Sequence, residues 1–306
     1  ILPDWSENQN RDTVKSDILI ESSTRLRSLS AGYDVVLSID GILPCQLTKP
    51  CVLMSNTLNY WTEAVAVQAS QWKGIVVPTS YYAKSIRAIN HTARIYPVSY
   101  GLPEDVLQEA NSVRPMMLKE DNMIIRLPHR PDYRKGHREA IEGLARALPE
   151  SRKTRIEISW LDEERYLPYF NEIESLAEQL GVRKQVFFCG WLSGSDQIRA
   201  MRNSCAMLQL GLFEESFGLS IVESILFGRP ALTRSQPAAR EIVGTSELLI
   251  ELTDPLDWYT ILVDYFARRV RPESIDSDRR FLIRQLSLKR MTTKYSHILT
   301  EIIESK

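Results

Sequence analysis

The sequence has no long hydrophobic run and almost no net charge. Its 306 residues include 38 Lys and Arg against 39 Asp and Glu, which gives a formal net charge of -1. A nucleic-acid partner is therefore not expected, because such proteins usually carry a basic excess. No stretch approaches the roughly 20 apolar residues that a membrane span needs. With 43% hydrophobic and 25% charged residues, the chain has the composition of a globular protein with room for two domains.

Cysteine and histidine are also scarce, with four of each. No C-x-x-C pair occurs and no histidine lies at ligand spacing beside a cysteine, so a zinc site is not expected. Reduced thiols in a cytoplasmic protein are the simplest interpretation of Cys45, Cys51, Cys189 and Cys205. The chain begins at Ile1 with neither Met nor a signal peptide, which is compatible with a fragment or with joined segments.

The single D-x-D motif, Asp276-Ser277-Asp278, stands in a polar stretch before an expected helix. A pair of metal ligands would be expected after a strand instead. We therefore interpret these residues as a helix cap or turn, and predict no metal ligands and no metal dependence.

Short apolar runs alternate with longer helical patterns, which predicts parallel sheets built from βαβ units. The first part of the chain shows four strands, at 34–39, 51–54, 74–78 and 93–98. From residue 122 six strands form a complete doubly wound set, at 123–127, 155–159, 186–189, 206–210, 230–233 and 248–250. The expected helices are 61–71, 81–89, 136–148, 166–180, 195–203, 217–227, 240–243, 254–270 and 279–305.

This pattern predicts two domains and a terminal helix. The first, residues 1–113, is short or incomplete, because it shows only about four strands. Residues 1–30 instead indicate a loop and an amphipathic helix, and 111–121 form the candidate linker. The second domain covers 114–285, and 286–306 is a helix that could pack back on the first domain.

The most informative stretch is residues 213–230, FEESFGLSIVESILFGRP. It indicates a loop after a strand, then a helix that begins near Gly218. A helix N-terminus offers unpaired N–H groups and a partial positive charge, both of which suit a phosphate. Gly218 has no side chain to hold a pyrophosphate away from those amides.

Two glutamates flank this helix start. Glu223 lies among apolar residues in the second turn, where an unpaired carboxylate is costly and a ribose diol would supply two donors. Glu215 precedes the helix, within reach of sugar hydroxyls of the same ligand. Either glutamate alone is compatible with a solvated or Arg-paired surface position. Together, in register with E-S-F-G and G-R-P, they favour a ligand site.

The run resembles the E-x7-E signature of the family-four retaining glycosyltransferases, because Glu215 and Glu223 fall eight residues apart. This resemblance implies an α/β GT-B fold, with two Rossmann-like doubly wound domains facing across a cleft. It implies that Glu215 contacts the donor sugar and Glu223 the ribose. The backbone around the Phe-Gly pair would hold the diphosphate, which assigns donor binding to Ser216, Phe217, Gly218 and Leu219.

A second stretch, residues 124–137 (IIRLPHRPDYRKGH), is similar to the family's G-R-(loop)-K-G pattern. Cations at the end of a strand are well placed for a ligand in the crevice there. The resemblance assigns Arg130 and Lys135 to neutralising the diphosphate leaving group, with Arg126 as a fallback. His129 stands where the family has its first glycine. A solvated basic loop is the alternative interpretation.

Three weaker matches extend the resemblance. Gly190 and Trp191 follow a strand and would flank the nucleobase, although plain packing explains Trp191 equally well. Glu241 matches the acid of the family's G-G-x-x-E segment, whose glycines are missing here. Residues 99–107 resemble the N-G-V-D segment that leads into the hinge.

The histidine that such enzymes often carry after a central strand of the first domain is missing. The corresponding strand here is followed by Asn56 and Thr57. Of the four histidines only His129 is near the expected site, where it serves equally well as a loop residue. The absence motivates a second hypothesis, a catalytically impaired GT-B subunit that supports a partner transferase. A nucleotide-sugar epimerase is the third.

The resemblance implies transfer of a sugar from a nucleotide-diphosphate sugar to an acceptor hydroxyl with retention, and without a tightly bound cofactor. The partners expected are the donor and a glycan, lipid or small-molecule acceptor, and the oligomeric state is left open. The expected location is the cytoplasm. The basic start of the terminal helix admits peripheral contact with the inner membrane face, and a solvated helix face is the alternative.

Overall fold

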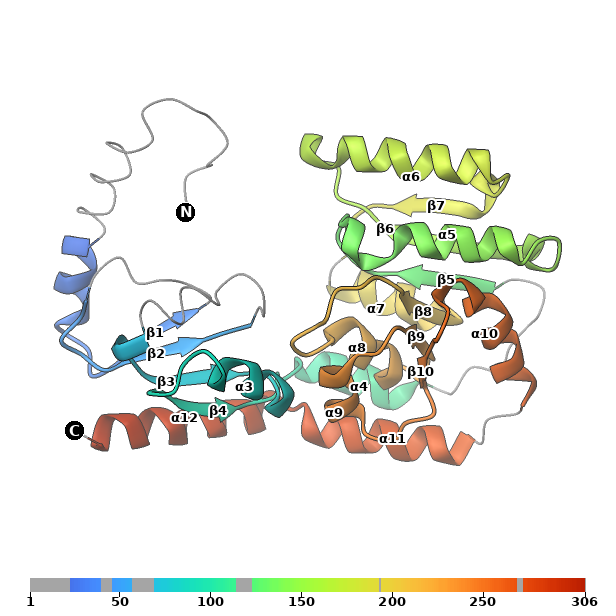
Figure 1. Ribbon diagram of the computed structural model, residues 1–306. Helices are drawn as coiled ribbons and strands as arrows, with labels where there is room; N and C mark the ends of the chain where they lie inside the picture. Colours follow the sequence, from blue (N-terminus) through green and yellow to red (C-terminus); the bar gives the residue numbers. More distant parts are fainter. Residues whose placement is uncertain are drawn as a thin grey trace, which may run out of the picture. The chain divides into compact units, whose positions relative to one another are not determined.

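The computed structural model describes residues 23–39, 46–56, 69–113, 123–192, 194–268 and 272–305. The chain divides into two compact units (Figure 1). The first comprises Ile1–Val98 and Thr292–Lys306, and the second comprises Ser99–Met291.

The first unit is built on a parallel sheet of four strands that pair in chain order, β1-β2-β3-β4. These strands are β1 (Val36–Ile39), β2 (Cys51–Met54), β3 (Trp72–Val77) and β4 (Arg94–Pro97). The helix α3 (Ser80–Arg87) joins β3 to β4, and it begins where the Thr79 hydroxyl accepts from the Tyr82 amide at 3.2 Å. The four predicted strands are confirmed.

Two other segments belong to this unit. Residues 23–30 are helical. The end of α12 (Leu288–Glu304) packs on the sheet, where a Cβ at Gly74 would come within 2.7 Å of the Ile302 side chain. Several sequence-based assignments lie outside the described residues: Cys45, Thr57 and most of the predicted helix 61–71.

The second unit contains a six-stranded parallel sheet in the order β10-β9-β8-β5-β6-β7. The order reverses between β5 and β8, as the predicted doubly wound topology requires. The strands are β5 (Met123–Leu127), β6 (Thr154–Ser159), β7 (Val186–Cys189), β8 (Ala206–Gln209), β9 (Ala231–Thr233) and β10 (Leu249–Glu251).

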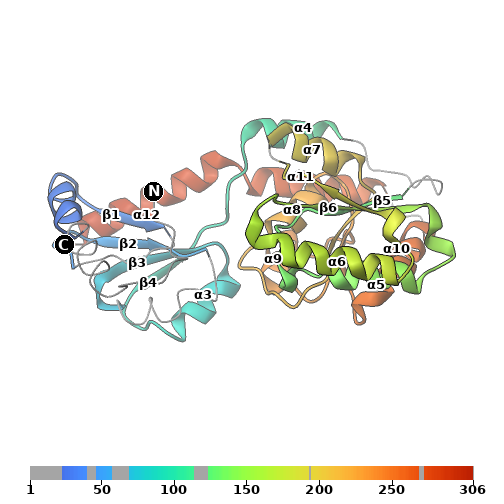
Figure 2. The same ribbon diagram turned by 90° about the horizontal axis from the view of Figure 1, so that it is seen from above.

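Helices cover both faces of this sheet (Figure 2). One face packs against α5 (His137–Arg146), α6 (Leu167–Gln179) and α10 (Trp258–Ala267). The other packs against α4 (Glu104–Ser112), α7 (Gly194–Asn203), α8 (Leu219–Leu226), α9 (Pro237–Val243) and α11 (Pro272–Gln285). The fold class expected from the sequence, α/β with two parallel sheets, is confirmed.

Two details differ from the sequence-based expectations. Residues 99–113 contain the helix α4, which packs in the second unit through Leu107 and Ala110, whereas the sequence grouped them with the first domain. The expected helix 279–305 is two helices, because the chain turns between α11 and α12. There the Leu286 carbonyl accepts from the Leu102 amide at 2.7 Å, and the Ser287 hydroxyl accepts from the Arg290 amide at 3.3 Å.

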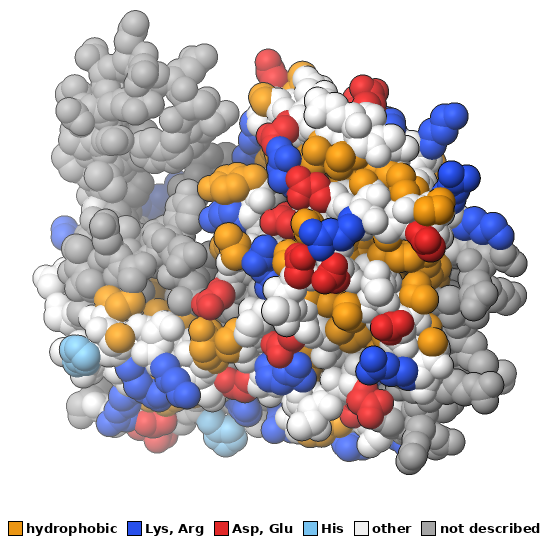
Figure 3. Space-filling model, turned by 45° about the vertical axis from the view of Figure 1, so that its right-hand side comes forward, with side chains coloured by type: hydrophobic (Ala, Val, Ile, Leu, Met, Phe, Trp, Pro, Cys, Tyr) orange, Lys and Arg blue, Asp and Glu red, His pale blue; other side chains and the backbone are white. Residues whose placement is uncertain are grey.

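The D-x-D motif also differs, since Asp276-Ser277-Asp278 lies inside α11 rather than at its start. Asp276 pairs there with Arg279, one turn further along, at 2.9 Å. Within the described residues, no group of metal-ligating side chains is found. Of the helices that the structure describes, none has the length and hydrophobicity to span a membrane. Figure 3 shows basic and acidic side chains interspersed over the forward face of the second unit.

Candidate active site

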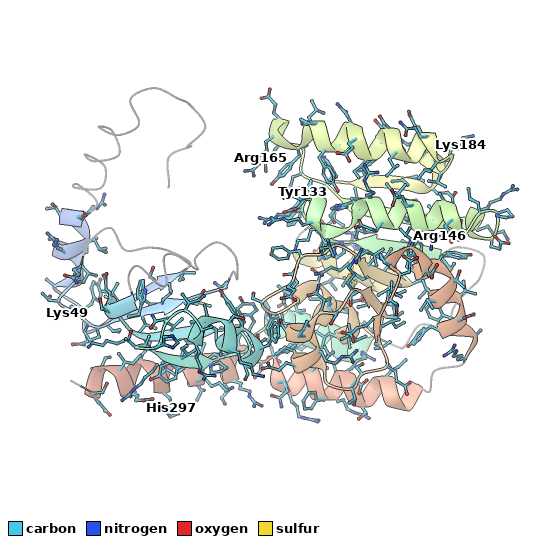
Figure 4. All side chains as sticks on the ribbon, in the orientation of Figure 1. Lys49, Tyr133, Arg146, Arg165, Lys184 and His297 are labelled. Carbon is cyan, nitrogen blue, oxygen red and sulfur yellow. The ribbon has the colours of Figure 1, made fainter. Side chains whose placement is uncertain are left out.

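The candidate residues lie beyond the carboxyl ends of β5 and β8, on either side of the reversal in strand order. In open parallel sheets this is where ligands bind, because the loops diverge there and leave a crevice. The helices that follow the strands begin at the same edge. In Figure 4, Tyr133 and Arg165 mark the starts of α5 and α6, and Arg146 and Lys184 mark the opposite edge.

Two glycines allow the loop after β5 to touch the loop after β8. Gly136 has φ 86° and ends the short 3-10 turn Tyr133–Lys135 just before α5. A Cβ at Gly136 would overlap the backbone of Leu210 and Gly211, and one at Gly211 would overlap the Arg134 carbonyl. The contact therefore excludes a side chain at either position, and it fixes Lys135 against the loop that carries Glu215.

Lys135 and Glu215 form an ion pair between their Nζ and Oε1 atoms. Lys135 is only 9% exposed, and its ammonium lies 4.2 Å from the centroid of the Phe213 ring. Glu215 Oε1 also accepts from Gln209 Nε2 at 3.1 Å. Two residues predicted for the donor site, 80 positions apart in the chain, are thus in direct contact.

The helix α8 begins directly after this loop. Gly218 is its N-cap residue, with φ 82° and ψ 49°, and a Cβ there would lie 2.8 Å from that of Ala239. The first turn therefore has a bare glycine at the place predicted for a diphosphate. Ser216 is half-buried and Leu219 is 40% exposed. Phe217 differs, since its ring is 1% exposed and packs 4.6 Å from that of Tyr100, which makes the side chain a core group.

Glu223 lies on α8, one turn further into the unit. Its carboxyl group is partly buried and accepts no hydrogen bond from any described residue. Burial raises the pKa of Glu223 to about 7. A carboxylate without a partner at this depth is the feature that the sequence analysis associated with a ligand diol.

The two arginines among the candidate cations have environments that differ from each other and from that of Lys135. The Arg130 side chain is 56% exposed, with Nη2 3.9 Å from Asp132 Oδ2, so it is free to reach a ligand. Arg126 is fully buried and donates to Ser159 Oγ at 2.9 Å, with Glu157 Oε2 at 3.4 Å. The fallback assignment of Arg126 is therefore wrong, because its guanidinium is enclosed within the sheet and its neighbours.

Two buried histidines lie near Lys135. His129 is 4% exposed, its Nε2 lies 3.0 Å from the Leu208 carbonyl, and burial lowers its pKa to about 3. His137 begins α5, and burial lowers its pKa to about 4. Both rings are neutral near pH 7, so neither supplies the imidazolium that the first domain lacks.

The remaining candidates are dispersed. Gly190 and Trp191 follow the edge strand β7, where Gly190 has open space around it and Trp191 is 50% exposed. Asn56 follows β2 in the first unit and is half-buried. Glu241 is exposed on α9.

Two buried amides near the site, Gln209 and Gln236, were not predicted, and each is 1% exposed. Gln209 ends an otherwise apolar strand, so its polarity was an available signal. Gln236 bonds to residues 213 and 215, which are 23 and 21 positions away, and no local pattern indicates such contacts.

Comparisons with known structures define the class of fold. A glycosyltransferase from Rickettsia africae ESF-5 superposes with a TM-score of 0.73 at 17% identity, over 99% of this chain and 85% of its own. Sucrose-phosphate synthase from Thermosynechococcus elongatus gives 0.77 at 12% identity, over 99% and 82%. Anabaena HepE in complex with UDP gives 0.72 at 14% identity, over 91% and 82%. The fold is that of the GT-B glycosyltransferases.

Sequence comparison adds a match within the second unit. Residues 112–258 match the model of the family described as Glycosyl transferases group 1, which supports the GT-B superfamily. An uncharacterized glycosyltransferase of Methanocaldococcus jannaschii is 28% identical over 139 residues, or 44% of this chain. The alignment covers 33% of that relative. Residues 112–258, which match the family model, contain every second-unit residue of the candidate site.

Proposed function

We propose that the chain is a retaining glycosyltransferase that moves a sugar from a nucleotide-diphosphate sugar to an acceptor hydroxyl. One observation carries the proposal: Glu223, which has no hydrogen-bond partner among the described residues, lies on the helix that follows the loop of the Lys135–Glu215 pair, at the strand reversal. The group 1 match over residues 112–258 supports the reaction class. The UDP and UDP-glucose complexes of HepE support a nucleotide-sugar donor.

In this proposal each end of the donor has its own contacts. The diphosphate binds the backbone amides around Gly218 and Leu219, where the helix dipole and unpaired N–H groups favour an anion. The ribose diol donates to Glu223, which supplies the missing partners of that carboxylate. Glu215 accepts from sugar hydroxyls, and the base lies near Gly190 and Trp191.

The chemistry then follows from charge. As the bond from the anomeric carbon to the diphosphate oxygen breaks, its electron pair stays on the diphosphate. Lys135 and the α8 amides stabilise this negative charge in a fixed arrangement, with little reorganisation of solvent. The exposed Arg130 side chain adds a further cation once it reaches the diphosphate. The acceptor hydroxyl attacks from the same face of the sugar, and its proton passes to the leaving phosphate. No protein nucleophile is required, and the first domain would bind the acceptor.

The proposal also requires an exchange of partners at Lys135. Without ligand its charge is compensated by Glu215. A bound diphosphate brings a second anion to the same ammonium, which weakens its hold on Glu215. Glu215 then becomes available to the sugar hydroxyls, so binding of the two halves of the donor is coupled.

The test is nucleotide release from a panel of UDP-, GDP- and ADP-sugars, with and without simple acceptors. We expect Lys135→Met to lower the rate by about 100-fold, since a fixed cation at a leaving group commonly contributes that much. Glu223→Ala should weaken donor affinity by about 10-fold or more, because charge-assisted hydrogen bonds are lost. Lys184→Met, at the opposite edge, and Glu178→Gln, exposed on α6, are the matched controls.

The outcomes separate the competing hypotheses. Nucleotide release that depends on Lys135 supports the transferase, and isomerised sugar nucleotide with no release indicates an epimerase. Binding without turnover, or no binding, indicates the non-catalytic subunit. Unchanged donor affinity in both site variants would refute the assignment of the site itself.

A further inference from the structure

A buried amide, Gln236, clamps the loop that carries Glu215. Gln236 precedes α9, directly beyond the end of β9, and is 1% exposed. Its Oε1 accepts from the Glu215 backbone amide at 3.0 Å, and its Nε2 donates to the Phe213 carbonyl at 2.9 Å. One side chain therefore satisfies both a donor and an acceptor of the neighbouring loop.

The clamp matters because residues 210–218 are neither helix nor strand. Backbone groups in such a segment have no ladder partners, and they must be paired by other means when buried. Gln236 supplies these partners at alternate residues, as an adjacent strand would. The backbone at Glu215 is thereby fixed relative to β9 rather than only to its own strand.

The Glu215 side chain is restrained separately. Gln209 Nε2 and Lys135 Nζ both donate to Oε1, which leaves Oε2 without a recorded partner among the described residues. Gln236 is itself anchored, since its backbone N–H donates to Glu251 Oε1 at 3.4 Å and Glu251 pairs with Arg240 at 3.1 Å. A continuous chain of polar contacts thus runs along the carboxyl edge from β10 to Glu215.

We propose that Gln236 is a positioning residue for Glu215, which sets the location of the carboxylate that meets the donor sugar. The inference rests on the proposed function, in which Glu215 binds the donor sugar. Gln236 contacts neither the sugar nor the diphosphate in this account, and it acts only through the loop backbone. Replacing Gln236 should therefore slow the transfer step, which depends on the position of the sugar. The affinity for the nucleoside diphosphate should be unchanged.

The test compares Gln236→Met with Gln185→Met. Methionine keeps a similar volume and removes both hydrogen bonds of each amide. Gln185 also bridges backbone groups, donating to the Ser151 and Thr154 carbonyls at 2.6 and 3.0 Å, but at the amino edge of the sheet. Both variants should lower the stability of the protein. Only Gln236→Met should displace the Glu215 carboxylate.

For Gln236→Met we expect kcat for nucleotide release from the best sugar nucleotide to fall by about 10- to 100-fold, the scale of a small misplacement. The Kd for the nucleoside diphosphate alone, which has no sugar, should stay within about threefold, since the helix-terminal anion site is unchanged. Gln185→Met should retain both values. Wild-type kcat in Gln236→Met, or a proportionate loss of kcat and nucleotide affinity, would overturn the inference.

A second measurement keeps this inference separate from the proposed function. Amide hydrogen exchange of residues 211–218 should accelerate in Gln236→Met and not in Gln185→Met, because the Glu215 amide loses its acceptor. If the wild type releases no nucleotide from any sugar, the proposed function fails, and this exchange result alone decides whether Gln236 orders the loop. Unchanged exchange would reject the positioning role in either case.

Discussion

Replacing Glu223 by glutamine should stabilise the ligand-free protein at alkaline pH. The carboxyl group is partly buried and has no recorded hydrogen-bond donor within the described residues. Burial raises its pKa from 4.5 to about 7, so ionisation costs the folded state more than the unfolded state. Glutamine keeps the shape and removes the charge.

The sign and size follow from linkage between protonation and folding. Because the folded pKa is raised, the folded state binds more protons than the unfolded state between pH 4.5 and about 7, and wild-type stability falls as pH rises through this range. At about 1.4 kcal/mol per pKa unit, the full cost above pH 7 is at most about 3 kcal/mol. Glu223→Gln should gain up to this amount at pH 8 and nothing at pH 4.

The assay is urea and thermal unfolding of the full chain from pH 4 to pH 8.5. A gain of about 3 kcal/mol corresponds to a rise of about 6–12 °C in the melting temperature of a domain of this size. Glu178→Gln, exposed on α6, controls for the loss of one negative charge from the surface. A difference that is constant across the pH range, or absent at pH 8, would contradict the reasoning.

Three further predictions concern the same unit. If the ribose diol binds ionised Glu223, nucleoside diphosphate binding at pH 6 should release close to one proton more from the wild type than from Glu223→Gln, measurable by calorimetry in buffers of different ionisation enthalpy. Gly211→Ala should destabilise the protein by about 2 kcal/mol or more in urea, because its Cβ overlaps the Arg134 carbonyl, whereas Gly190→Ala, in open space, should leave stability unchanged. Arg279→Met should cost about 2–4 kcal/mol, since its buried guanidinium donates to the Leu226 and Ala110 carbonyls at two helix ends, and Arg280→Met, exposed beside it, should cost little. If Gly211→Ala and Gly190→Ala lowered stability equally, or if Arg279→Met and Arg280→Met did, the assigned contacts would be contradicted.

The alternation of short apolar runs and helical patterns was sufficient to predict both sheets. The strand 186–189, for example, was predicted with its observed bounds, because a run of four apolar residues is bordered by polar residues and glycine. Buried parallel strands depend mainly on such local composition. The reversal in strand order also follows from the general topology of six βα units.

Other elements depend on contacts between distant segments. The break between α11 and α12 occurs where Leu102 donates to the Leu286 carbonyl, and the helical periodicity on either side continues without interruption in the sequence. The helix α4 was not predicted, and Leu107 and Ala110 become core residues by packing in the second unit. Contacts between distant segments therefore decided where α11 ends and which unit α4 joins.

The same distinction applies to the candidate site. Glu215 and Glu223 are recognisable because their spacing around one helix start is a local property of the chain. Gln236 is not recognisable, because its two bonds reach another loop, and Arg126 was misjudged because only tertiary structure encloses it.

The cost of an unpaired buried carboxylate connects the sequence with the chemistry. Glu223 lies among apolar residues, where a carboxylate needs partners. It has none in the described part of the chain, and burial raises its pKa to about 7. Its neighbour Glu215, by contrast, is held by Lys135 and Gln209. A protein that pairs one acid so fully and leaves the other without a partner in the described part of the chain retains a destabilising group in the second turn of α8. Ligand hydroxyl groups that donate to this carboxylate would recover that cost as binding energy, which is why Glu223 rather than Glu215 should dominate donor affinity.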